Sequence, residues 1–179
     1  MCGIVGAIAQ RNVSPILIEG LRRLEYRGYD SAGLALVGDN GLQRRRAVGK
    51  VAALADALAA SPLDSRLGIA HTRWATDGVP AERNSHPHAS RTVAVVHNGI
   101  IENHEALRTR LIDAGYAFES ETDTEVVAHL LQQQIDAGSS LRQALCAILP
   151  ELRGAYALAV IDANSPDHLL LARKGSPLV

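Results

Sequence analysis

The second residue of the chain is a cysteine, and its position gives it two functional groups. A small residue directly after the initiator Met1 is the kind from which Met is removed, and removal leaves a thiol and a free α-amine on Cys2. An α-amine titrates near about 7.7 to 8.0, so at neutral pH it is partly unprotonated. It can therefore act as a general base without a His and Asp partner. The alternative is that Cys2 is a small buried apolar residue at the start of a strand.

Two hydrogen-bond donors that suit an oxyanion lie side by side at Asn98 and Gly99. An Asn side-chain amide beside a Gly backbone N–H gives convergent donors, and glycine lets a substrate approach the backbone closely. The dipeptide also follows the apolar residues 93–96 and is a strong hairpin signal, so a tight turn is the alternative.

Two further segments carry side chains that suit the two ends of an amino acid. Arg73 can hold a carboxylate through two parallel hydrogen bonds, with the Thr76 hydroxyl as a third contact. The alternative for Arg73 is a surface salt bridge. Residues 120–125 precede a predicted helix, so an N-cap with acidic first-turn residues accounts for most of them, and one carboxylate there can equally bind an ammonium group.

Two other groups of reactive side chains carry weaker signals. His86 and His88 have no Asp, Glu or Cys at a recognisable zinc spacing, and the proline between them prevents helical presentation, so we predict no metal site. Cys146 lies beside apolar residues of a predicted helix and is interpreted as a core residue.

The elements that must position these residues alternate between helices and hairpins. Apolar periodicity and turn residues predict helices at 14–28, 51–61, 103–115, 127–135 and 141–152, and strands at 1–9, 32–37, 42–48, 67–70, 92–96, 154–161 and 168–172. Asn103 is a candidate N-cap of the third of these helices. Arg44, Arg45 and Arg46 are expected on a solvated sheet edge. The polar residues 72–91 form a candidate functional loop. Hairpins mixed with helices indicate an α+β fold with antiparallel sheets.

Length and composition exclude several classes of protein. The 179 residues are 47% apolar, which is enough for one core and one domain, residues 1–179. The net charge of -1 excludes nucleic acid or an anionic membrane as a partner. No apolar run approaches the roughly 18 residues of a spanning helix. The opening residues lack the pattern of a signal peptide, and the two cysteines fit a reducing compartment, so we expect a cytoplasmic protein.

Five separated segments together resemble one family. They are residues 1–6 (MCGIVG), 24–33 (LEYRGYDSAG), 71–76 (HTRWAT), 97–105 (HNGIIENHE) and 120–125 (SETDTE). In this order they are similar to the glutaminase domain of the glucosamine-6-phosphate synthases, the isomerizing glutamine:fructose-6-phosphate amidotransferases. The phosphoribosyl-transferring amidotransferases, which also begin with Cys after Met, are the second candidate, but residues 25–30 and 72–76 favour the glucosamine branch.

The resemblance implies a fold and a set of catalytic residues. The fold is an N-terminal-nucleophile hydrolase, a four-layer αββα sandwich with antiparallel sheets. By position, Cys2 is the nucleophile and, through its freed amine, the base, while Asn98 and Gly99 form the oxyanion hole. Thiolate attack on the glutamine amide releases ammonia, and water then hydrolyses the thioester to glutamate. The family implies no metal and no cofactor for this step.

The same resemblance implies how L-glutamine is held. The substrate-binding residues are Arg73 and Thr76 for the α-carboxylate, Asp123 with the Gly99 carbonyl for the α-ammonium, and Trp74, Asp77 and Arg27 around them. The family's glutaminase domain continues beyond residue 179 and is followed by a sugar-phosphate isomerase region. The sequence is therefore expected to be truncated at its C-terminus, and to reach fructose 6-phosphate only through the missing region. The oligomeric state stays open.

Three hypotheses about function follow from this resemblance. The chain is the N-terminal part of a synthase with the glutaminase chemistry encoded, or a glutaminase that supplies another sugar acceptor, or a non-catalytic chain that binds glutamine or a partner. Release of ammonia from glutamine separates the first two from the third, and the acceptor separates the first from the second.

Asp77 stands where the family usually carries His, beside the expected carboxylate site. A carboxylate about 6 Å from that of glutamine would repel it by roughly 2 to 3 kcal/mol at an effective dielectric near 20, or about 30- to 150-fold in binding. Asp77 and Gly78 make a plausible turn, so we expect the Asp77 side chain to face solvent. Asp77→His is then expected to leave the Michaelis constant for glutamine unchanged. A clearly lower constant would show that the carboxylate faces the substrate.

Overall fold

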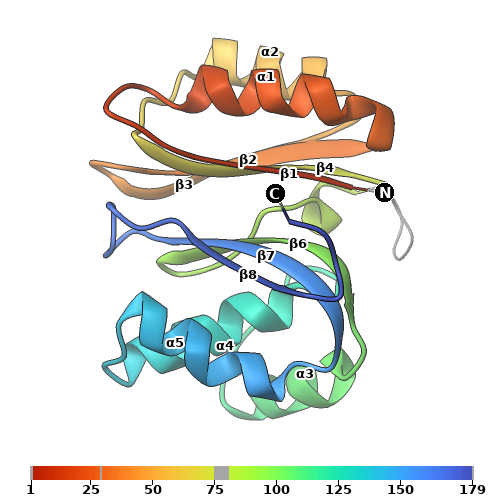
Figure 1. Ribbon diagram of the computed structural model, residues 1–179, viewed down its shortest axis with the longest axis vertical. Coiled ribbons are helices and arrows are strands. Elements are labelled where there is room, and N and C mark those ends of the chain that lie inside the picture. The colour runs from red at the N-terminus through yellow and green to blue at the C-terminus, as the bar shows by residue number, and fades with distance from the viewer. Residues whose placement is uncertain (1, 29, 75–80, 179) are drawn as a thin grey trace.

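Two antiparallel sheets lie face to face, with helices on both outer sides (Figure 1). The computed structural model describes residues 2–28, 30–74 and 81–178. Within these ranges the chain forms two four-stranded sheets and five α-helices. The layer order is therefore helix, sheet, sheet, helix, as the resemblance implies.

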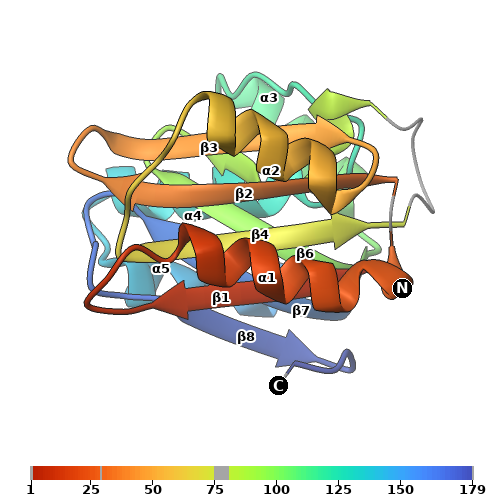
Figure 2. The ribbon, with the colours of Figure 1, turned by 90° about the horizontal axis from the view of Figure 1, so that it is seen from above.

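The first sheet has the strand order β1-β4-β2-β3. Its strands are β1 (Gly3–Ile8), β4 (Leu67–Arg73), β2 (Ser31–Gly38) and β3 (Gly41–Val48). Its outer face is covered by α1 (Ser14–Leu24), which lies along β1 and β4, and by α2 (Val51–Ala60), which lies along β2 and β3 (Figure 2). Along β2, Leu34 and Leu36 pack toward the helices, whereas Ala35 and Val37 pack toward the other sheet. This alternation follows from the period of two in a strand.

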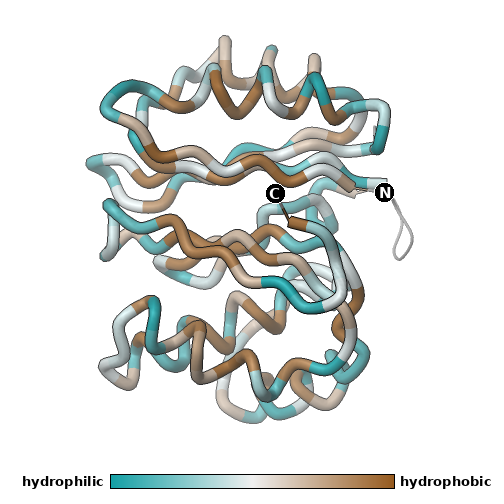
Figure 3. Tube along the Cα trace, in the orientation of Figure 1, coloured by the Kyte–Doolittle hydropathy of each residue, from teal (hydrophilic) through white to brown (hydrophobic). Residues whose placement is uncertain are grey.

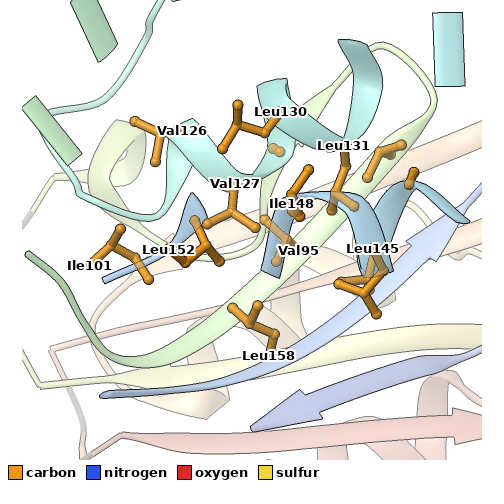
Figure 4. Packing of buried hydrophobic residues seen from close by; sticks show 14 of the residues in the cluster. Val95, Ile101, Val126, Val127, Leu130, Leu131, Leu145, Ile148, Leu152 and Leu158 are labelled. Carbon is orange, nitrogen blue, oxygen red and sulfur yellow. The ribbon is translucent and has the colours of Figure 1, made fainter. Parts of the chain in front are cut away.

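The second sheet has the order β5-β6-β7-β8. Its strands are β5 (His88–Ser90), β6 (Val93–Ile101), β7 (Gly154–Asp162) and β8 (Leu170–Lys174), and its outer face carries α3 (His104–Asp113), α4 (Glu125–Asp136) and α5 (Leu141–Ile148). Figure 4 shows Val127 and Leu131 of α4 beside Ile148 of α5 and Val95 of β6. This cluster of buried aliphatic side chains holds the helices on the sheet.

Aliphatic side chains, three of them alanines, fill the layer between the two sheets. Its buried members are Ala35, Val37, Leu67, Ile69, Ala94, Val96, Ala159 and Ile161. Figure 3 shows hydrophobic stretches along the strands of both sheets, with polar residues more frequent at the turns that connect the elements. The inner strands β2, β4 and β7 are thus buried on both faces, which is typical of sheets enclosed between layers.

Most of the predicted elements are confirmed, and the differences lie at their ends. The hairpins β2–β3 and β7–β8 form as predicted. Helix α1 ends at Leu24, and a 3₁₀ helix then spans Glu25–Arg27. Strand β4 continues to Arg73, so Thr72 and Arg73 lie in the strand and not in the predicted loop. The polar stretch that follows contains β5.

Two interpretations of single residues are wrong. Cys146 is exposed, because α5 buries Leu141, Leu145 and Ile148 on one face and Cys146 points away from it. The side chain of Asn103 does not cap α3, because its amide instead bridges the Glu151 carbonyl and the Arg153 N–H, at 2.9 Å each.

The arginines of β3 are on an edge strand, as predicted, but they are half-buried. Arg44 donates to the Pro87 carbonyl at 3.3 Å. Arg46 donates to the Arg83 carbonyl at the same distance. These side chains therefore connect the edge of the first sheet to the segment that leads into β5.

The N-terminus of α2 is capped from outside the helix, by Glu25. The Val51 N–H donates to Glu25 Oε1 at 2.8 Å, and the N-cap residue Lys50 makes no side-chain bond of its own. We expect Glu25→Ala to lower the free energy of unfolding by about 1 kcal/mol, since an N-terminal donor loses its acceptor and the helix dipole its anion. Glu19→Ala, which breaks the exposed pair with Arg23, is the control and should cost under about 0.5 kcal/mol. Urea denaturation measures the free energy of unfolding of both variants. Equal losses of stability in the two would contradict the capping role of Glu25.

In the part of the chain that the structure describes, every helix is too short or too polar to cross a membrane.

Candidate active site

Cys2 lies at the start of β1 and is held by both sheets. The backbone N–H of Trp74, directly after β4, donates to Cys2 Sγ at 3.3 Å. The Asn98 side chain on β6 donates from Nδ2 to the Cys2 carbonyl at 3.1 Å. The next residue, Gly3, donates its N–H to Thr72 Oγ1 at 3.2 Å. The start of β1 is half-buried and fixed on three sides, so the sulfur has a defined position.

Arg73 is the last residue of β4 and is 5% exposed. The chain after α1 passes directly behind it, because a Cβ on Gly28 would come within 2.8 Å of the Arg73 carbonyl carbon and 3.0 Å of the Trp74 nitrogen. The Asp30 N–H then donates to the Arg73 carbonyl at 3.2 Å. Glycine at position 28 therefore allows the segment around Arg27 to support the end of β4.

Trp74 and Arg27 form the open side of the region. Trp74 is 45% exposed, although its backbone contacts Cys2. Arg27 is half-buried, and its Nε donates to the Tyr26 hydroxyl at 3.2 Å. The 3₁₀ helix that carries Arg27 contacts β4, and the roles of both residues toward a substrate stay predictions.

Asn98 and Gly99 lie inside β6, so the tight-turn alternative is wrong. Strand β6 pairs with β7 without interruption, and Gly99 faces Tyr156. Gly99 has φ +130°, and a Cβ there would lie 2.0 Å from the Ala155 carbonyl oxygen. Only glycine fits this position, which leaves an exposed stretch of backbone directly after Asn98.

Asp123 lies just before α4, and its side chain contacts β6 beyond Asn98 and Gly99. Its Oδ2 accepts the Ile101 N–H at 2.7 Å, and its Oδ1 accepts the Thr124 hydroxyl at 3.3 Å. The side chain is 23% exposed. A carboxylate has about four acceptor positions, so Asp123 can accept these bonds and still receive an ammonium group.

Four buried histidines adjoin the site: His71 on β4, His86 and His88 at β5, and His97 on β6. The ring centroids of His71 and His86 are 4.2 Å apart, and those of His86 and His88 are 4.7 Å apart. The Thr124 hydroxyl lies 2.9 Å from both His86 Nε2 and His97 Nδ1. No role is predicted for these histidines from the sequence alone, and no metal site is predicted at His86 and His88.

Burial keeps these imidazoles neutral. It lowers the pKa of His71 to about 4 and that of His88 to about 3. The pKa of His86 is also lowered, by burial and then by the neighbouring His71. Burial lowers the pKa of His97, although Asp123 opposes the shift. Removing a charged imidazolium from water costs more free energy than its interactions with neighbouring groups restore.

A sequence signal for two of these histidines existed. His71 directly follows the apolar residues 67–70, and His97 directly follows 93–96. A polar residue that continues a buried apolar strand must find a partner inside the protein. Such a residue beside a predicted oxyanion pair is a candidate for positioning it.

Two predicted substrate-binding residues, Thr76 and Asp77, lie outside the described residues. Within residues 2–28, 30–74 and 81–178, no three His, Cys, Asp or Glu side chains are grouped in a way that could hold a metal ion.

Two open cavities of about 410 Å³ each lie on the helical sides of the molecule. One reaches from Tyr116 and Glu119 to Glu125 and His129 beside α4. The other is a mostly apolar groove between α1 and α2. Neither is lined by Cys2 or Asn98.

The arrangement around Cys2 suits nucleophilic attack on a carboxamide. Cys2 supplies the sulfur, the Asn98 amide lies within hydrogen-bond distance of the same residue, and the exposed Gly99 backbone follows. Donors placed beside a nucleophile can stabilise the oxyanion that forms when it attacks a carbonyl.

Comparison with known proteins identifies the family of the chain. A family model described as a glutamine amidotransferase domain matches residues 71–177. Glutamine--fructose-6-phosphate aminotransferase [isomerizing] from Pseudomonas aeruginosa is 64% identical over all of this chain, and the protein of that name from Escherichia coli (strain K12) is 61% identical over all of it. The chain spans about 30% of the length of these relatives.

Two solved structures share the fold. The glutamine phosphoribosylpyrophosphate amidotransferase from B. subtilis aligns over 91% of this chain and 35% of its own, with a TM-score of 0.77 and 25% identity. A structure described as the allosteric regulatory enzyme of purine biosynthesis aligns over 90% of this chain and 35% of its own, with a TM-score of 0.74 and 28% identity. The chain has the N-terminal-nucleophile hydrolase fold and belongs to the family of glutamine amidotransferase domains.

Proposed function

We propose that the chain hydrolyses the side-chain amide of L-glutamine, with Cys2 as the nucleophile. The observation that supports this most directly is the pair of contacts at Cys2, in which Trp74 N–H meets the sulfur and the Asn98 amide meets the carbonyl. These contacts join residues at the start of β1 and the end of β4 to β6 of the other sheet, around the cysteine that the resemblance implies as the nucleophile.

The reaction has two stages, and atoms balance in each. After removal of Met1, the α-amine of Cys2 takes the thiol proton, and the sulfur bonds to the amide carbon of glutamine. Asn98 Nδ2 and the Gly99 N–H stabilise the oxyanion. The C–N bond then breaks, and the amine returns the proton to the departing ammonia. Water hydrolyses the thioester, which releases glutamate and restores the thiol.

Glutamine is oriented by charges at both of its ends. Arg73 and Thr76 bind the α-carboxylate in this proposal, and Asp123 binds the α-ammonium group. The burial of Arg73 supports its part, because a guanidinium with little exposure binds a carboxylate with less competition from water.

The proposed use of the ammonia is the synthesis of glucosamine 6-phosphate from fructose 6-phosphate. The supporting observation is the identity of 61–64% with aminotransferases named for this reaction, against 25% and 28% for the two structures linked by name to phosphoribosylpyrophosphate or purine synthesis. We place the fructose 6-phosphate site in the length of the relatives that this chain does not cover. Two free cysteines fit a reducing compartment, so we propose that the reaction occurs in the cytoplasm.

Release of ammonia from glutamine by the purified chain tests the proposal. Intact mass spectrometry after treatment with a diazoketone analogue of glutamine should show loss of Met1 and one adduct, which peptide mapping places at Cys2. A chain that neither releases ammonia nor reacts with the analogue would contradict the proposal. The remaining hypothesis would then be a chain that binds glutamine without turnover. The acceptor is tested separately, by adding the ammonia-dependent part of a relative with either fructose 6-phosphate or phosphoribosylpyrophosphate.

A further inference from the structure

The Asn98 side chain is held at both ends by hydrogen bonds. Its Nδ2 donates to the Cys2 carbonyl at 3.1 Å, and its Oδ1 lies 2.9 Å from Nε2 of His71. A carboxamide can rotate by 180° and exchange its donor and acceptor ends, so these two contacts decide which end faces the nucleophile.

A third group determines the protonation of His71 independently of the amide. His71 Nε2 also lies 3.1 Å from the backbone carbonyl of His97, which can only accept. Nε2 must therefore carry the hydrogen. An Nε2–H facing Asn98 requires Oδ1 at that end, and the Cys2 carbonyl requires Nδ2 at the other. Both sides thus favour the same orientation of Asn98.

The unpaired ring nitrogens agree with this assignment. Among the described atoms, His71 Nδ1 is buried without a hydrogen-bond partner, as are His86 Nδ1 and His97 Nε2. The Thr124 hydroxyl has one hydrogen, which goes to Asp123, so His86 Nε2 and His97 Nδ1 must both donate to it. Each of these three nitrogens is then a bare acceptor, and the N–H of each of the three rings has a partner.

Neighbouring rings hold His71 in place. Its ring is 1% exposed and lies 4.2 Å, centroid to centroid, from the His86 ring. His86 is fixed in turn by Thr124 at the start of α4. His71 is thus a rigid donor that belongs to the first sheet and bonds to Asn98 of the second.

We propose that His71 is a positioning residue of the oxyanion hole, which holds Asn98 with its Nδ2 turned toward the nucleophile. The inference rests on the proposed function. Without the Nε2–H of His71, only the Cys2 carbonyl still favours this orientation of the Asn98 amide, and the rotated amide would present an oxygen to the oxyanion. His71 acts through Asn98 and makes no contact with glutamine in this proposal.

A double-mutant cycle on the 179-residue chain tests this. His71→Leu removes the donor at similar volume and should lower kcat for glutamine hydrolysis by about 10- to 100-fold, with KM changed by less than about 2-fold. His71→Gln places an amide N–H₂ where Nε2 lies and can donate to both acceptors, so it should restore kcat to within about 3-fold of the original. In an Asn98→Ala background, His71→Leu should have no further effect on kcat.

Several outcomes would overturn the proposal. An unchanged kcat in His71→Leu would do so, and so would an equal loss of kcat with and without Asn98, which would indicate a general structural role. If His71→Leu does not fold, ¹⁵N NMR of the unaltered chain decides. A hydrogen on Nε2 and a bare Nδ1 support the proposal, and a hydrogen on Nδ1 contradicts it. If the unaltered chain releases no ammonia, the proposed function fails, whereas the NMR result still tests the His71–Asn98 contact.

Discussion

Replacing Cys2 with alanine is expected to lower ammonia release from glutamine by at least about 10⁴-fold. Without the sulfur no thioester forms, and an oxyanion hole and bound substrate alone give only a small residual rate. The half-buried position of Cys2 at the start of β1 means that the variant should keep its fold. A coupled assay for ammonia, with circular dichroism to check folding, measures both effects.

Cys146 provides a matched control for this variant. It is the other free cysteine of the chain and is exposed on the outer face of α5. Cys146→Ala should keep activity within about 2-fold. A Cys2→Ala variant that still releases ammonia would refute the nucleophile. A chain that retains Met1 and is nevertheless fully active would refute the part proposed for the α-amine.

Acid is expected to destabilise the protein well above the range in which its carboxylates titrate. The folded state lowers the pKa of His71 to about 4 and that of His88 to about 3, whereas both are near 6.5 in the unfolded chain. Their contribution is fully present above pH 6.5 and is lost as the pH falls toward the folded values, because only the unfolded state then binds protons. Between pH 8 and pH 5 the contribution of each histidine to the free energy of unfolding falls by about 2 kcal/mol, or about 4 kcal/mol for both together.

Urea denaturation at pH 8 and pH 5 measures this loss. The lowered pKa values of His86 and His97 act in the same direction. His88→Gln keeps a donor for Thr122, which His88 contacts at 3.0 Å, and should reduce the loss by about 2 kcal/mol. His168→Gln, at an exposed position before β8, should leave the loss unchanged. Equal stability at the two pH values would contradict neutral buried histidines.

Much of the fold could be predicted because apolar periodicity is strong in this chain. Leu17 and Leu21 recur on one face of α1, and the turn residues 38–41 place the β2–β3 hairpin within one residue of its observed ends. The same method failed at residues 98–99. A turn signal and a strand with a positive φ both require glycine, and local sequence cannot separate them because the difference lies in pairing with β7.

The candidate site was predicted in part. The structure brings Cys2, Trp74 and Asn98 into contact. The catalytic and substrate-binding roles of all the site residues stay predictions: Cys2, Arg27, Arg73, Trp74, Thr76, Asp77, Asn98, Gly99 and Asp123. The histidines next to the site were missed, because their contacts join residues between 26 and 38 positions apart in the chain. Such residues come together only when one sheet packs against the other.

Cys2 lies at the start of a strand of one sheet, and Asn98 lies in the other sheet. The side chains packed between the sheets therefore set the distance between these two residues. The packed side chains include Ala35, Ala94 and Ala159, where an added methylene would act as a wedge. Reaction rates fall steeply when reacting groups are displaced by about 1 Å. Interior alanines remote from the substrate thus set the spacing between the two sheets. A larger side chain there can slow turnover, although it contacts neither glutamine nor any residue that binds it.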